Sequence, residues 1–164
     1  MISLIVQNAM NEQIKNELFS AYLYLSMAAF FEEKNLPGFA HWMRVQAQEE
    51  QEHALKFFDF IHDRGGKITL LPIEQPKAEW KSALDAFNDA YEHEQLVTGM
   101  INKIYETALE QKDYPSQIML QWFIDEQVEE EKNASDIVEQ LKRIEERGTA
   151  ILMLDHELGK RSEG

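Results

Sequence analysis

The chain has 164 residues, of which 44% are apolar and 28% charged, and its formal net charge is −14. This length suits one domain with a substantial core. The acidic balance excludes a nucleic-acid binder, which would carry a basic stripe. Taken alone, it fits either a soluble cytosolic surface or a protein that handles cations.

The sequence contains no cysteine, so disulfides, cysteine-based metal sites and thiol catalysis are excluded. This composition fits a reducing compartment. The N-terminal residues lack the basic region of a signal peptide, and no apolar run approaches the roughly 18 residues needed to cross a bilayer. We therefore expect a cytoplasmic protein that contacts neither nucleic acid nor membrane.

Four long helices and a short fifth are predicted from helical periodicity and from the positions of Gly and Pro. The third begins at a capping box, Ser82 with Asp85, or up to one turn earlier between Ala78 and Lys81. Gly148 is expected to end the fourth helix, and Thr149 to cap the fifth. The expected helices cover residues 4–34, 37–64, 82–111, 114–146 and 150–160.

The lengths of the connections predict the topology. The first and third connections are short, which makes the helices that they join antiparallel neighbours. Gly65 and Gly66 are expected to end the second helix, and the connection over residues 67–81 is long enough to cross the roughly 45 Å length of a 30-residue helix. We therefore expect an all-α fold: a four-helix bundle of two antiparallel hairpins joined by a long crossover, with a short fifth helix, in a single domain over residues 1–164.

Each long helix carries an apolar stripe that polar residues interrupt near its middle. The interruptions are Glu17 in the first helix, Glu50 and His53 in the second, Glu94 in the third, and Gln127 and Glu130 in the fourth. The whole stripe of the third helix is predicted as Leu84, Phe87, Tyr91, Glu94, Thr98, Ile101, Tyr105 and Ala108.

Carboxylates are normally excluded from such positions, because a buried unpaired carboxylate costs several kcal/mol. One interior Glu can be protonated or reach solvent, but four at matching depth, with no Lys or Arg on the stripes at that level, indicate bound cations. Carboxylates with one imidazole suit iron or manganese.

The expected ligands form two sets. Glu17, Glu50 and His53 would hold one metal ion, and Glu94 and Glu130 would hold the second, with Glu50 bridging. Di-iron carboxylate bundles commonly use Glu-x-x-His twice. Here the fourth helix has Gln127 and Glu130 instead, so the second ion should be held more weakly.

These residues and their spacing resemble the ferritins, specifically the bacterial and archaeal non-haem kind, over the whole chain. The resemblance implies that Glu17, Glu50 and His53 form the first ferroxidase iron site and that Glu94 and Glu130 form the second. It further places Gln127 beside the second site, Tyr24 and Trp122 near the di-iron centre, and Glu49, Glu126 and Glu129 at a third iron site.

The resemblance also implies a function. The chain would oxidise Fe(II) with O2 or hydrogen peroxide at the di-iron centre, as a ferroxidase, and would store Fe(III) as a mineral inside a shell of 24 identical subunits. Glu52 occupies the position of the haem-ligating Met of bacterioferritins, so no haem is expected. The lack of cysteine excludes the iron module that rubrerythrins add.

Two other functions remain open at this level. One is a soluble di-iron oxidase or peroxidase without a storage role. The other is a non-catalytic helical interaction protein with a buried polar network. His41, His62, His93 and His156 lie off the predicted metal level or off the stripes, and we expect them on the surface or in packing.

Overall fold

The computed structural model of the chain describes residues 1–145 and 147–163. These residues form five helices and no strand. The helices are α1 (Leu4–Glu33), α2 (Pro37–Asp63), α3 (Ala83–Glu110), α4 (Tyr114–Ile144) and α5 (Gly148–Leu158). The predicted all-α bundle with a short fifth helix is thus confirmed.

Side-chain caps explain where three of the helices begin. At the start of α1 the Ser3 hydroxyl accepts a hydrogen bond from the Val6 N–H at 3.5 Å. Ser82 accepts one from the Asp85 N–H at 3.0 Å before α3, as the capping box predicts. Before α4, the Asp113 carboxylate accepts a hydrogen bond from the Ser116 N–H. Such caps satisfy backbone N–H groups that have no partner within the helix.

The prediction differs from the structure at the start of α3, at the end of α4 and at both ends of α5. Residues 78–81 do not extend α3, because Ser82 is fully extended, with φ −162° and ψ 170°, and caps the helix from outside. Gly148 begins α5 instead of ending α4, which stops at Ile144 because Glu145 adopts the left-handed conformation. The fifth helix ends at Leu158, two residues before the expected end. Glu146, the expected end of α4, lies outside the described residues.

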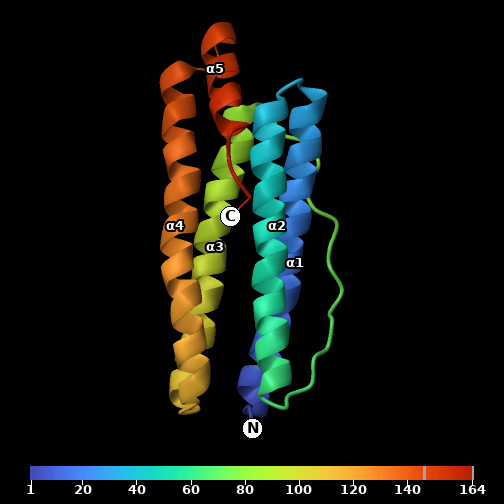
Figure 1. The fold of residues 1–164 in the computed structure, drawn as a ribbon, viewed down its shortest axis with the longest axis vertical. Helices are drawn as coiled ribbons and strands as arrows, with labels where there is room; N and C mark the ends of the chain where they lie inside the picture. The colour runs from blue at the N-terminus through green and yellow to red at the C-terminus, as the bar shows by residue number, and fades with distance from the viewer. Residues whose placement is uncertain (146, 164) are drawn as a thin grey trace.

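The topology is the one that the connections predict. In Figure 1, α1 rises from the N-terminus and α2 returns beside it, while α3 descends and α4 rises beside it. The crossover runs the full length of the bundle along α1, so that α2 and α3 are parallel. Gly65, with a φ of +67°, turns the chain out of α2 into the crossover. That backbone conformation favours glycine.

Two apolar clusters fill the bundle. Between them lies a polar layer, formed by the residues that interrupt the four apolar stripes. The first occupies the end where α5 packs and includes Phe31, Phe39 and Phe87, each fully buried. The second occupies the end near the N-terminus and includes Met10, Phe57 and Ile101, also fully buried. The polar residues that interrupt the four stripes are therefore enclosed on both sides by apolar side chains.

Helix α5 is held against α2 by a polar contact and a close backbone approach. The Asp155 carboxylate accepts hydrogen bonds from the Gly38 and Phe39 N–H groups, at 2.8 and 3.0 Å. A Cβ at Gly38 would lie 1.7 Å from the Asp155 carbonyl oxygen, so only glycine fits there. Among the described helices, none is both long and apolar enough to span a membrane.

Candidate metal centre

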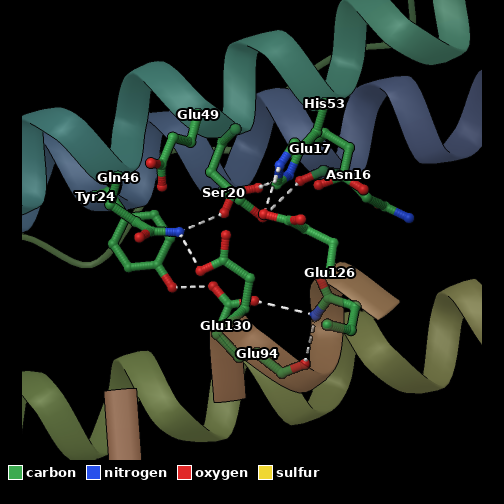
Figure 2. A network of polar contacts seen from close by, with 12 residues as sticks. Asn16, Glu17, Ser20, Tyr24, Gln46, Glu49, His53, Glu94, Glu126 and Glu130 are labelled. Atoms are coloured by element: carbon green, nitrogen blue, oxygen red, sulfur yellow. Dashed lines mark hydrogen bonds and ion pairs between the residues drawn. The ribbon is translucent and has the colours of Figure 1, made fainter. Parts of the chain in front are cut away.

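The polar layer brings one or two side chains from each long helix into the middle of the bundle. Glu17, Glu50, Glu94 and Glu130 are exposed by only 1%, 2%, 2% and 3%, and His53 by 4%. Figure 2 shows Glu17 and His53, from α1 and α2, facing Glu94 and Glu130, from α3 and α4. Four carboxylates thus share a space that is closed to bulk water.

Ligand atoms in this layer lie close enough to share ions. Glu17, Glu50 and His53 each offer one atom within 4.8 Å of the other two, and so do Glu50, Glu94 and Glu130. Glu50 is common to both triplets, which is the arrangement expected of a carboxylate that bridges two ions. These triplets contain the residues that the sequence assigns to the two sites.

Hydrogen bonds leave the carboxylates only partly satisfied. The Gln13 amide donates to Glu17 Oε1 at 2.8 Å. Among the residues that the structure describes, Glu17 Oε2 is buried with no hydrogen-bond partner. A buried acceptor without a donor is costly. A cation between this oxygen and its neighbours in the triplet, Glu50 and His53, would remove that cost.

Glu94 is oriented by two neighbours that the sequence also places at the centre. The Tyr24 hydroxyl donates to Glu94 Oε1, and the Gln127 amide nitrogen lies 3.2 Å from Glu94 Oε2. The same nitrogen lies 3.3 Å from the Thr98 hydroxyl, which donates to Glu131 at 2.6 Å. In this arrangement Gln127 donates to a carboxylate of the centre and helps to fix its rotamer.

Burial and mutual repulsion raise the pKa values of the centre. Desolvation raises the pKa of Glu17 and Glu50 well above their usual range, and neighbouring carboxylates add to this effect. Burial also raises the pKa of Glu94, and burial with the charge of Glu94 raises the pKa of Glu130 to about 8. Within the described part of the chain, these four carboxylates form no ion pair with Lys or Arg. Burial thus favours the protonated forms of these carboxyl groups, and a bound cation would favour their charged forms.

The three residues expected at a third iron site have different surroundings. Glu126 is half-buried, and its carboxylate groups with His53 and Glu130 within 4.8 Å. Glu49 is also half-buried but is paired with Arg161 at 2.6 Å. Glu129 is exposed. The structure brings Glu126 up to the centre but does not gather all three into one cluster with it.

Trp122 lies at the edge of the centre, as expected. Its ring is 5.5 Å from the His53 ring, in an edge-on arrangement. The Lys56 ammonium lies 3.9 Å from the centre of the Trp122 ring. Of the other histidines, His93 is mostly buried and bonds to the Ser20 hydroxyl at 2.7 Å, which agrees with the expected packing role.

Sequence reasoning missed three polar residues around the centre. Gln46 is not among the predicted site residues, yet its amide donates to Glu50 at 3.0 Å and to Glu130 at 2.8 Å. Gln13 lies one helical turn before Glu17, a spacing that could have indicated the contact. Arg161 lies 112 residues from its partner Glu49, and no local pattern predicts that contact.

Comparisons with known proteins agree with this geometry. Residues 7–144 match the family model described as a ferritin-like domain. The bacterial non-heme ferritin of Bacteroides fragilis is 42% identical over 161 residues, which are 98% of this chain and 100% of the relative. The bacterial non-heme ferritin of Campylobacter jejuni is 38% identical over 155 residues, 94% of this chain and 93% of the relative.

Solved structures show the same agreement. An engineered closed form of the Archaeoglobus fulgidus ferritin superposes with a TM-score of 0.99 at 49% identity over 100% of both chains. An open-pore ferritin of that archaeon superposes with a TM-score of 0.98 at 50% identity, over 99% of this chain and 100% of the other. A chain that shares its helices, its crossover and nearly its full length with these proteins belongs to the ferritin family.

Proposed function

We propose that this protein stores and detoxifies iron, and that it oxidises Fe(II) to Fe(III) at the buried centre. The chain would act as a single di-iron domain. The observation that carries the proposal is the position of Glu50, which belongs to both ligand triplets within 4.8 Å. Two ions that share one carboxylate are close enough to be oxidised together.

Iron is the substrate of the proposed reaction. Glu17, Glu50 and His53 would bind one Fe(II), and Glu50, Glu94 and Glu130 the other. Oxidation of both ions releases two electrons, which together with two protons reduce one O2 to hydrogen peroxide, or one hydrogen peroxide to two waters. Hard carboxylate oxygens favour Fe(III) over Fe(II) and so lower the potential of the couple.

The remaining polar residues would orient the ligands. Tyr24 and Gln127 hold Glu94 through hydrogen bonds, and Gln127 could also turn its amide oxygen toward the second ion. Glu126, with Glu49 and Glu129, would receive further iron beside the centre. Binding of Fe(II) would displace the protons that burial retains on the carboxyl groups, so iron uptake should release protons.

Storage requires a hollow assembly, and we propose a shell of 24 copies in the cytoplasm with iron held as a ferric oxide-hydroxide mineral. Large apolar side chains on the outer faces of the helices support an assembly of copies. They include Leu4, Ile5, Tyr22, Leu25, Leu55, Leu96, Val128, Leu152 and Met153, each more than 40% exposed. Exposed apolar side chains in such numbers are typical of interface surfaces.

The test combines anaerobic Fe(II) titration, aerobic oxidation and the mass of the native assembly. The wild-type chain should bind Fe(II) saturably and oxidise it faster than buffer does. Glu17→Gln should slow the initial oxidation about 100-fold or more, while Glu12→Gln, an exposed charge on the same helix that pairs with Lys15, should not change it.

Two outcomes would overturn parts of the proposal. Absence of saturable Fe(II) binding, with oxidation no faster than buffer, would leave a helical interaction protein. Fast oxidation by a monomer or dimer would remove the storage role and would leave a soluble di-iron oxidase or peroxidase.

A further inference from the structure

The C-terminal segment returns from α5 to the middle of α2, where Arg161 lies beside the metal centre. After α5 ends at Leu158, the segment runs down between α4 and α2 (Figure 1). Arg161 anchors it there. Its carbonyl oxygen accepts from His41 Nε2 at 2.7 Å, and its guanidinium carbon lies 4.3 Å from the centre of the Trp42 ring.

The guanidinium group makes three further hydrogen bonds to α2. Arg161 Nη2 donates to Glu49 Oε2 at 2.6 Å and to Gln46 Oε1 at 3.0 Å, and Nη1 donates to the Trp42 carbonyl at 3.2 Å. Only 17% of the Arg161 side chain is exposed. An arginine that is mostly buried, stacked on an aromatic ring and bonded to a carboxylate is held in one geometry.

Arg161 fixes the orientation of the Gln46 amide. A guanidinium group can only donate, so the amide oxygen of Gln46 must face Arg161 and its NH2 group must face the centre. That NH2 group donates to Glu50 Oε1 at 3.0 Å and to Glu130 Oε2 at 2.8 Å. Arg161 is therefore linked through one side chain to two carboxylates of the ligand triplets.

Arg161 also neutralises Glu49, which is adjacent in sequence to the shared ligand Glu50. A cation that used Glu49 as a ligand would have to displace the guanidinium group. Space for that displacement exists, because Arg161 lines an open groove of about 330 Å³ with Trp42, Asn133, Asp136, Ile137 and Leu158.

We propose that Arg161 is a positioning residue that holds Glu49 away from iron and turns the Gln46 amide toward Glu50 and Glu130. In this arrangement tight iron binding is limited to the two triplets, and a third ion binds only when the C-terminal segment is released from α2. The inference rests on the proposed iron-binding function and adds the element that controls occupancy beyond the two triplets.

Anaerobic Fe(II) titration by calorimetry tests the proposal on the assembled protein. Arg161→Gln should leave the two tight ions bound and should lower the dissociation constant of a third ion about tenfold or more, since a charge-assisted hydrogen bond to Glu49 no longer competes. Lys160→Gln is the matched control. It removes the same charge from the neighbouring residue, whose ammonium bonds to Glu157 on the surface and to no other side chain among the described residues, and should bind iron as the wild type does.

A double variant identifies the carboxylate. If the freed ligand is Glu49, the tighter third ion should disappear in Arg161→Gln combined with Glu49→Gln. A third-ion affinity in Arg161→Gln equal to that of the wild type would overturn the proposal, as would the same gain in Lys160→Gln or in the double variant. A wild type that binds no Fe(II) would instead overturn the proposed function itself, so the two failures are distinguishable.

A second measurement keeps Arg161 in place. In the Lys160→Gln background, tryptic cleavage after Arg161 reports release of the segment, because the neighbouring lysine is gone. The bond should resist cleavage when the protein is free of iron or holds the two tight ions. It should be cut faster once the third ion binds, as measured by the mass of the shortened chain. Equal cleavage at all three loadings would contradict release of the segment.

Discussion

The apolar clusters at the two ends of the bundle are packed around buried aromatic rings, whereas the layer between them holds four buried carboxylates. At one end Phe31 stacks on Phe39 with ring centres 5.0 Å apart, and at the other Phe57 stacks on Phe123 at 4.2 Å. Burial of such rings stabilises a fold, whereas burial of like charges destabilises it. The ends therefore hold the bundle together, and the centre reduces its stability, a cost that the proposed ion binding would offset.

The largest expected effect belongs to an end of the bundle. Phe31→Ala removes a ring with no exposed surface that contacts Phe39 and Phe87. We expect the free energy of unfolding to fall by about 3–5 kcal/mol, while Fe(II) stoichiometry is retained. Thermal and chemical denaturation measure the first quantity and anaerobic titration the second. A loss below about 1 kcal/mol would show that this cluster does not carry the stability.

Loss of a carboxylate from the centre should raise the stability of the ion-free protein, whereas loss of a ring from an end lowers it. Glu50→Gln removes the carboxylate common to both triplets, and we expect Fe(II) affinity to fall about 100-fold or more. Near neutral pH the ion-free variant should melt at a higher temperature than the ion-free wild type, because a neutral amide replaces a buried carboxyl group that must either keep a proton or carry a repelled, desolvated charge. A lower melting temperature, or unchanged affinity, would contradict the contrast between the centre and the ends.

The stability cost of the buried carboxyl groups should also depend on pH. Burial and Glu94 raise the folded-state pKa of Glu130 to about 8, whereas an unfolded Glu titrates near 4.5. The folded state thus holds the proton more tightly, and the stability that this supplies is complete below the lower value and is lost as the pH rises through the higher one. The melting temperature of the ion-free protein should fall across this window, and in Glu130→Gln it should fall less. An equal pH dependence in the two proteins would contradict the assignment.

The fold and the two ligand triplets could be predicted because their determinants are local. Helix periodicity placed Glu17, Glu50, Glu94 and Glu130 at one depth, and the lengths of the connections set the order of the helices. The inward face of α3 was less well predicted. Tyr91, Thr98 and Tyr105 are expected on that face, but each is only half-buried. The residues immediately before them, Ala90, Val97 and Ile104, are buried instead, because a helix that packs against two neighbours buries a wider face than one seven-residue stripe describes.

Contacts made by the C-terminal segment could not be predicted. Asp155 bonds to the start of α2 across 117 residues of sequence, and Arg161 reaches Glu49 across 112. Neither residue lies on a stripe with a partner at helical spacing. The predicted stripes carry no Lys or Arg at the level of the centre, and only the return of the chain after α5 brings an arginine near it.

The smallest expected effect belongs to Asp155. It is a buried carboxylate outside the centre, and its hydrogen-bond partners are supplied by the protein. Its Oδ1 accepts from two backbone N–H groups at the start of α2, where the helix dipole favours a negative charge. Asp155→Ala should therefore lower the free energy of unfolding, by about 1–2 kcal/mol, while Glu50→Gln raises it.

Glu157→Ala is the control on the same helix, since the Glu157 side chain bonds to Lys160 at the surface and to no other side chain in the part of the chain that the structure describes, and its effect should stay within about 0.5 kcal/mol. Denaturation of the ion-free proteins measures all three variants. If Asp155→Ala were to stabilise the chain as Glu50→Gln is expected to do, burial alone would make a carboxylate destabilising. If it destabilises the chain, the difference between the two carboxylates lies in their partners, two fixed N–H donors for Asp155 and an absent cation for Glu50.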